Sequence, residues 1–167
     1  MGVDAKDRAI LRVLQEDART SQAEIGRQVG LSAAAVNERI HRLEREGVIR
    51  RFTVLLDEQK LGVEITVYVD VFIESPAHER EFVALVSKLP EVQECHFVTG
   101  DFSCLVKARV PDRKALRELV LDRINSLAGV RQTRSCIVLD TTRDDPRIEI
   151  PEPEEEGKPS RTRRRKP

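Results

Sequence analysis

An alternation of strand and helix patterns between residues 65 and 140 restricts the fold more than any other feature of the sequence. This stretch opens with ITVYVDVFIE, which is rich in β-branched residues, and closes with VRQTRSCIVLD. Between them lie two helical patterns and two further strands, which flank Gly100-Asp101, a pair typical of a hairpin turn. The resulting order βαββαβ predicts an α+β domain of the ferredoxin-like type over residues 65–142.

Both helical patterns of this domain carry apolar residues on one side. The first follows Pro76, which suits the first position of a helix, and Asp112 is expected to cap the second. They end in similar junctions, LPEVQE and LAGVRQ, which indicates two βα halves with both helices on one sheet face. The opposite face stays open, and such a face is a common oligomer interface. One side of the first strand carries Thr66, Tyr68, Asp70 and Phe72.

Residues 1–52 follow a different, helical period. Asp4 and Ser21 are expected to cap two short helices, and Gly30 suits the left-handed residue that ends the second. Ser32 then caps a third helix, AAAVNERIHRLEREG, which buries Val36, Ile40 and Leu43. Two helices joined by a glycine-containing turn predict a helix-turn-helix. We expect VIRRFTVLLD to form a wing hairpin, which leads into a linker over residues 53–64.

The third helix offers the residue types that read DNA. Ala33 and Ala34 allow close approach to bases, Asn37 suits adenine, and Arg42 suits guanine or phosphate. The charged remainder of the outer face, at Glu44, Arg45 and Glu46, is expected to be merely solvated. The predicted binding residues for double-stranded DNA are Ser32, Ala33, Ala34, Asn37, Glu38, His41, Arg42 and Arg50.

The composition sets limits on partners and location. The 29 basic residues balance the 29 acidic ones, so DNA binding needs a local basic patch. We expect the DNA affinity of each copy to be modest, so two copies are needed and the protein is expected to be a homodimer. Three cysteines without paired spacing fit a reducing cytoplasm, and no apolar run is long enough to span a membrane. Residues 143–167 combine prolines with acidic and basic blocks, which predicts disorder; RTRRRKP either adds phosphate affinity or has no dedicated role.

Catalytic and metal sites are not expected. Cys95 and His96 are neighbours on one strand and point to opposite faces, so they cannot share a metal ion. Cys104 and Cys136 lie in apolar strands, where a cysteine is usually a small buried hydrophobe. None of the usual hydrolase, zinc or nucleotide motifs is present. We therefore expect neither an enzyme nor a bound cofactor.

The chain resembles the Lrp/AsnC family of feast/famine transcriptional regulators over about residues 4–142. The resemblance rests on GLS…V…R…RLE…GVI and on V…C…VTGD, which occur in the family's order. It implies an N-terminal winged helix-turn-helix that binds DNA and a C-terminal sandwich domain that dimerises through its sheets. It also implies assembly into octamers or other rings of dimers, with small effectors, usually amino acids, bound between dimers.

The same resemblance implies an effector cleft at Thr99, Gly100, Asp101, Ser103, Thr133 and Ser135. The family often has GDYDYLL where this chain has GDFSCLV, so Ser103 replaces an acid that helps to hold the effector. We therefore expect the cleft to bind a ligand other than leucine, or no ligand. Two alternatives share the fold: a decarboxylase of the haem-biosynthesis type, and an amino-acid sensor without DNA binding. The small and polar outward residues of the third helix argue against both.

Overall fold

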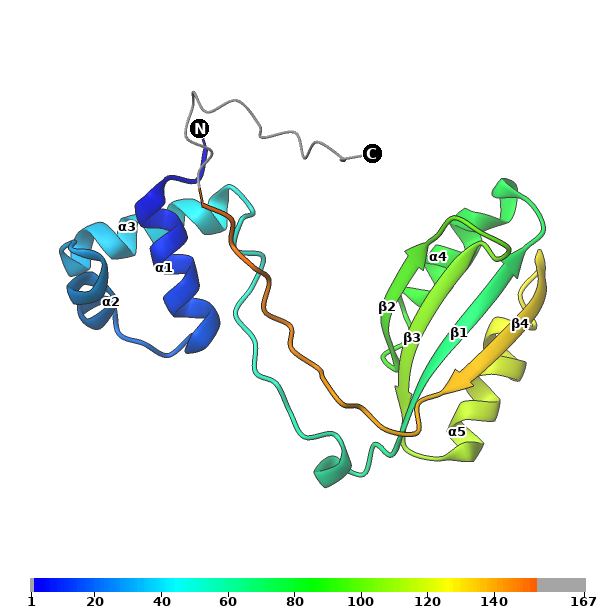
Figure 1. Ribbon diagram of the computed structural model, residues 1–167. Helices are drawn as coiled ribbons and strands as arrows, with labels where there is room; N and C mark the ends of the chain where they lie inside the picture. The colour runs from blue at the N-terminus through cyan, green and yellow to red at the C-terminus, as the bar shows by residue number, and fades with distance from the viewer. Residues whose placement is uncertain (1, 153–167) are drawn as a thin grey trace, which may run out of the picture. The chain divides into compact units, whose positions relative to one another are not determined.

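The structure is a computed structural model that describes residues 2–152. These residues form two compact units (Figure 1). The first unit comprises residues 2–54 together with residues 145–152, and the second comprises residues 55–144. The chain therefore leaves the first unit, forms the second and returns to the first. Over the part that is described, no helix is both long and apolar enough to cross a membrane.

The first unit contains three helices: α1 (Ala5–Glu16), α2 (Gln22–Val29) and α3 (Ala33–Arg45). Their predicted caps are confirmed. The Asp4 carboxylate accepts a hydrogen bond from the Asp7 amide, the Ser21 hydroxyl from that of Glu24, and the Ser32 hydroxyl from that of Ala35. These bonds satisfy amides that have no partner within the helix, and so they define where each helix begins.

The turn between α2 and α3 depends on two glycines. Gly30 ends α2 with a φ of 69°, in the left-handed region that favours glycine. A Cβ added at Gly26 would lie 2.5 Å from the carbonyl oxygen of Leu31, so only glycine allows the turn to approach α2 so closely. The three helices enclose a small apolar core formed by Ile10, Ile25, Val29, Val36 and Ile40.

The expected wing is not formed within the described chain. Residues 50–57 have no strand structure, although Phe52, Val54, Leu55 and Leu56 suit one and are exposed. A strand needs a neighbour for its amide and carbonyl groups, and no described segment supplies this hydrogen-bonded neighbour here. The prediction of a wing hairpin over VIRRFTVLLD is therefore wrong.

The second unit has the predicted βαββαβ order. Its strands are β1 (Ile65–Ile73), β2 (Val92–Phe97), β3 (Cys104–Val110) and β4 (Val130–Ile137), in the sheet order β2-β3-β1-β4 with antiparallel neighbours. A short 3₁₀ turn (Pro76–His78) leads into α4 (Glu79–Val86), and α5 (Arg113–Arg117) continues as a π-helical segment (Glu118–Ile124). A further 3₁₀ turn (Gln59–Leu61) precedes β1. The ferredoxin-like fold is thus confirmed.

One face of this sheet is covered and the other is open. Both helical segments contribute to a single core with the inward side of β1 and β3, as Phe82, Leu119, Val67, Val69 and Val106 show. In β1, side chains alternate between faces, and Val67, Val69 and Val71 belong to the core, so Thr66, Tyr68, Asp70 and Phe72 lie on the face without helices. The sequence places these four residues on one side of the strand but does not say which face that side belongs to. On that face Asp70, which is only 6% exposed, accepts a hydrogen bond of 2.7 Å from Nε of Arg134.

Part of the segment that was expected to be disordered has a defined path. Residues 145–152 belong to the first unit and form hydrogen bonds with side chains of α1. Composition favoured disorder because these residues have little apolar surface to bury; polar contacts with α1 hold them instead. Residues 153–167, where the rest of the predicted disordered tail lies, are outside the described residues.

Candidate DNA-binding surface and effector hollow

The start of α3 is the most accessible part of the helix-turn-helix. Ala33 and Ala34, in its first turn, are exposed, and Ser32 caps the helix while remaining exposed. Small side chains at a helix N-terminus let the backbone approach a surface closely, and the unpaired amides of the first turn favour an anionic ligand. This geometry suits contact with DNA phosphates and base edges.

The other predicted DNA-binding residues divide into two groups. Glu38, His41 and Arg50 are exposed, and Nδ1 of His41 lies 3.0 Å from Oε2 of Glu44. Asn37 is half-buried, and its Oδ1 accepts a hydrogen bond of 2.6 Å from Nε2 of Gln22. Gln22 was not predicted; it is the first residue of α2, directly after the capping residue Ser21, and that position is the only sequence signal for it. The amide of Asn37 is therefore positioned by a neighbouring helix and keeps its NH₂ group for another partner.

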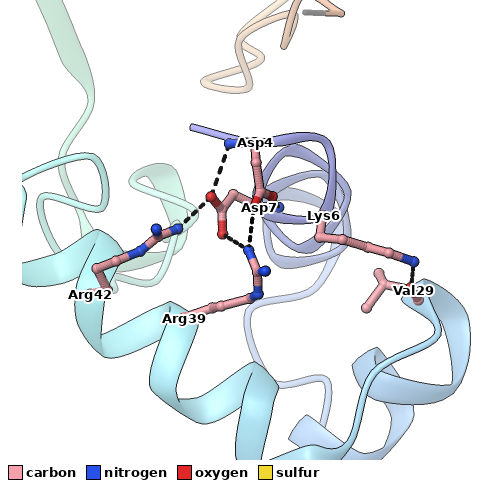
Figure 2. A network of polar contacts seen from close by, with 6 residues as sticks. All are labelled: Asp4, Lys6, Asp7, Val29, Arg39 and Arg42. Atoms are coloured by element: carbon pink, nitrogen blue, oxygen red, sulfur yellow. Dashed lines mark hydrogen bonds and ion pairs between the residues drawn. The ribbon is translucent and has the colours of Figure 1, made fainter. Parts of the chain in front are cut away.

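Arg42 is placed differently from the prediction. Its guanidinium forms an ion pair with the carboxylate of Asp7, which is completely buried (Figure 2). Arg39 donates to the same carboxylate at 2.8 Å and to Asp4 at 2.6 Å. A buried carboxylate needs such partners because desolvation penalises an unpaired charge. Arg42 thus connects α3 to α1, and its predicted contact with DNA has no support in this geometry.

The network around Asp7 positions the recognition helix. The hydrogen bond from Arg39 lowers the pKa of Asp4, and the same contact raises the pKa of Arg39. Lys6, on the same end of α1, donates to the carbonyl oxygen of Val29 at the end of α2 (Figure 2). Ion pairs and one backbone contact therefore hold the N-terminal end of α1 to both helices of the helix-turn-helix. The sequence signal was an acid at position 7, three residues before buried Ile10.

The second unit contains an open hollow of about 470 Å³ beside the predicted hairpin turn. The turn closes with a hydrogen bond of 3.1 Å from the Val98 amide to the Ser103 carbonyl oxygen, and Gly100 has a φ of 131°. Both observations confirm a hairpin, although its loop is longer than the Gly-Asp pair alone. The lining residues come from β1, the hairpin and β4: Phe72, Ile73, Glu74, Asp101, Ser103, Arg131 and Gln132.

Two of the six predicted effector residues line this hollow. They are Asp101 and Ser103, whereas Thr99 and Gly100 belong to the same turn without lining it. Thr133 and Ser135 pair with Val71 and Val69, on the side of β4 that faces the helices, and the structure does not bring them into the hollow. Side chains alternate between the two faces along a strand, so a prediction that is shifted by one residue selects side chains on the wrong face. Arg131 and Gln132 provide the lining from β4.

The hollow presents charges of both signs. Among the described residues, no ion pair joins the carboxylates of Glu74 and Asp101 to the guanidinium of Arg131. Ser103 is occupied by the backbone, because its hydroxyl accepts from the Ile73 amide at 3.1 Å and donates to the Ile73 carbonyl at 3.4 Å. A ligand with one ammonium and one carboxylate group would match the remaining charges.

Comparisons with known proteins agree with both halves of this description. Residues 3–44 match the AsnC-type helix-turn-helix domain, and residues 66–148 match the Lrp/AsnC ligand binding domain. The leucine-responsive regulatory protein of Salmonella typhimurium is 41% identical over 150 residues, which cover 89% of this chain and 92% of that protein. The protein of the same name from Escherichia coli K12 is 40% identical over the same shares.

Solved structures show the same fold. A transcriptional regulator from Neisseria meningitidis in complex with L-methionine has a TM-score of 0.83 and 30% identity, covering 89% of this chain and 97% of that one. The feast or famine regulatory protein of M. tuberculosis complexed with L-methionine has a TM-score of 0.80 and 31% identity, covering 88% and 99%. In both cases the likeness extends over nearly the whole length of the solved chain.

Proposed function

The chain belongs to the Lrp/AsnC family and is a DNA-binding, effector-responsive transcriptional regulator, and from this premise we propose which surfaces do the binding. The first turn of α3 contacts DNA through Ser32, Ala33 and Ala34, with Asn37, Glu38, His41 and Arg50 as further contacts. The observation that carries this proposal is the exposed, serine-capped start of α3, set by the Gly30 turn.

The effector in this proposal is a free α-amino acid bound in the hollow of the second unit. Arg131 pairs with its carboxylate, while Asp101 and Glu74 pair with its ammonium group. Two similar regulators were solved with L-methionine, which supports this class of ligand. Ser103 is committed to the backbone of β1, so it supplies no charge of its own. The ligand's side chain meets Phe72 and Ile73 at the edge of the hollow.

The proposal also includes a homodimer that assembles into an octamer or another higher oligomer. Three features of the described residues support it: the open sheet face, the unpaired run of residues 50–57, and exposed apolar side chains at Ile137 and Leu139. Groups that find no partner within one chain are satisfied by a second copy. We also propose a cytoplasmic location, which a DNA target and three free cysteines support.

Family membership indicates a regulator, and we propose that the chain has no catalytic activity. Burial raises the pKa of Cys104 to about 12, so its thiol is protonated near neutral pH and is a poor nucleophile. Burial also raises the pKa of Cys95. These two thiols therefore lack the environment that activates a catalytic cysteine.

A thermal-shift series against the common amino acids tests the effector proposal. A ligand that binds the native state raises Tm. The Arg131→Ala variant should bind the same amino acid about tenfold or more weakly, because it loses a charge-assisted hydrogen bond to the ligand's carboxylate. Arg80→Ala removes an exposed arginine from α4 and serves as the matched control. Equal affinity in Arg131→Ala and Arg80→Ala would contradict this assignment of the carboxylate site.

A further inference from the structure

A side-chain pair joins the two helices of the helix-turn-helix next to the start of α3. Gln22 is the first residue of α2, and its Nε2 donates a hydrogen bond of 2.6 Å to Oδ1 of Asn37, in the second turn of α3. Gln22 is exposed and Asn37 is half-buried, so the pair lies at the surface of the first unit. Both side chains are therefore accessible to a ligand that approaches the start of α3.

The backbone on each side of this pair is held in place. The Ser21 hydroxyl caps α2 by accepting a hydrogen bond of 3.2 Å from the Glu24 amide, and Gln22 directly follows this cap. On α3, Asn37 follows Val36, which is completely buried in the core that α2 and α3 share. Only side-chain rotations are needed to form the hydrogen bond between Gln22 and Asn37, and the bond then selects one orientation of the Asn37 amide.

The direction of this hydrogen bond decides which end of the Asn37 amide is free. Oδ1 faces the donor Nε2 of Gln22, whereas the NH₂ group has no hydrogen-bond partner among residues 2–152. If the Asn37 amide alone were turned over, two NH₂ groups would face each other, and neither can accept. A typical side-chain hydrogen bond favours the bonded orientation by about twofold to tenfold. Asn37 thus presents a donor to its surroundings.

A donor at this position has definite partners in the major groove of DNA. Asn37 lies one turn after the exposed Ala33 and Ala34, and helical side chains lean toward the N-terminus, so its amide extends over these two small residues. Guanine offers two acceptors in the major groove, N7 and O6, whereas cytosine offers an amino donor. Adenine needs a donor and an acceptor together for its two-bond contact with asparagine, and the acceptor of Asn37 already binds Gln22. The oriented amide therefore suits guanine.

We propose that Asn37 donates to guanine, and that Gln22 is the positioning residue that selects this base by orienting the Asn37 amide. Gln22 acts through Asn37 and needs no contact of its own with DNA. The effect concerns sequence preference at one base pair, because phosphate contacts elsewhere supply affinity without reading sequence. This inference rests on the proposed DNA-binding function of α3.

The test measures, by fluorescence anisotropy, the ratio of affinities of the full chain for two duplexes that differ only by exchange of G·C for C·G at one base pair. Selection from a random duplex library gives the preferred site, and N37A identifies the base pair as the one at which it loses preference. Q22K introduces a side chain that can only donate, Q22E one that can only accept, and Q22A one that does neither. A23K and A23E add the same charges to the neighbouring exposed residue of α2 and are the matched controls.

The unmodified chain should favour guanine at this base pair by about tenfold, and Q22K should retain that ratio. Q22A should lower the ratio by about threefold or more. Q22E should invert it, because Oδ1 of Asn37 then faces the base, and the inversion should vanish when Q22E is combined with N37A. A23K and A23E should change both affinities alike and leave the ratio as it is.

Three results would overturn the inference: a preference of the unmodified chain for A·T at this base pair, an unchanged ratio in Q22E, or an inversion in Q22E that persists when Asn37 is also replaced. The last result would mean that the residue at position 22 reads the base directly. Equal binding of the unmodified chain to every duplex would instead refute the proposed function of α3.

Discussion

Replacing Asp7 by alanine should destabilise the first unit by about 3 kcal/mol, because it leaves two guanidinium groups without their buried partner. Asp7 is fully buried, and Arg39 and Arg42 both pair with it. It also accepts a hydrogen bond from the Asp4 amide, so the start of α1 loses a cap at the same time. Removing one partner of such a network costs far more than removing an exposed ion pair.

Thermal unfolding followed by circular dichroism measures this loss. Glu46→Ala removes an exposed acid at the end of α3 and should leave the unfolding transition within about 0.5 kcal/mol of the original. Asp7→Asn retains the shape but removes the charge and is expected to lie between the two. A transition in Asp7→Ala that matches Glu46→Ala would show that the network contributes no net stability.

Introducing a glutamate at Ala34 should abolish specific DNA binding while the protein stays folded. Ala34 is exposed in the first turn of α3, where the proposal places bases and phosphates within contact distance. A negative, larger side chain there meets like charge and prevents close approach. The loss of readout contacts is about 1–3 kcal/mol for each recognition helix, which is roughly tenfold to a hundredfold in affinity per helix.

Ala18→Glu is the control for this change, since it adds the same charge to the exposed loop between α1 and α2. Anisotropy titrations with both variants separate a local clash at α3 from a general electrostatic effect. If Ala34→Glu and Ala18→Glu bind DNA equally well, the first turn of α3 does not face DNA. Circular dichroism of both proteins checks that the helices are retained.

Local chemistry made much of the fold predictable. The caps at Asp4, Ser21 and Ser32 and the left-handed Gly30 depend on neighbouring residues alone, and all four are confirmed. The βαββαβ order follows from periodicity and turn residues, so it too could be predicted. Local signals within a few residues, such as caps, turn residues and apolar spacing, indicate where these helices and strands begin and end.

Features that depend on distant partners were missed. Arg42 lies at the edge of the outward face of α3, and only the buried carboxylate of Asp7, 35 residues earlier, explains why its side chain faces α1. Residues 147–152 are held by side chains of α1 that lie more than 130 positions earlier in the sequence, and composition does not reveal these contacts. The expected wing failed for a related reason, since residues 50–57 find no hydrogen-bonded strand partner within the described chain.

The hollow that we propose as the effector site lies beside the predicted hairpin turn, but only part of the predicted residue set lines it. Asp101 and Ser103 follow from the hairpin turn, yet Arg131 and Gln132 were passed over for Thr133 and Ser135. The register of β4 decides which alternate residues face the open side, and a bulge between Phe72 and Ile73 shifts that register near the hollow. Sequence alone does not give the position of such a bulge.

The most direct test of the central claim is the affinity of the full chain for DNA with and without each amino acid. We predict that the DNA upstream of its own coding sequence binds more tightly than unrelated DNA. We also predict that at least one amino acid changes that affinity by about fivefold or more, the usual range of coupling between two sites. Equal affinity for both DNAs, unchanged by every amino acid, would contradict an effector-responsive DNA-binding regulator.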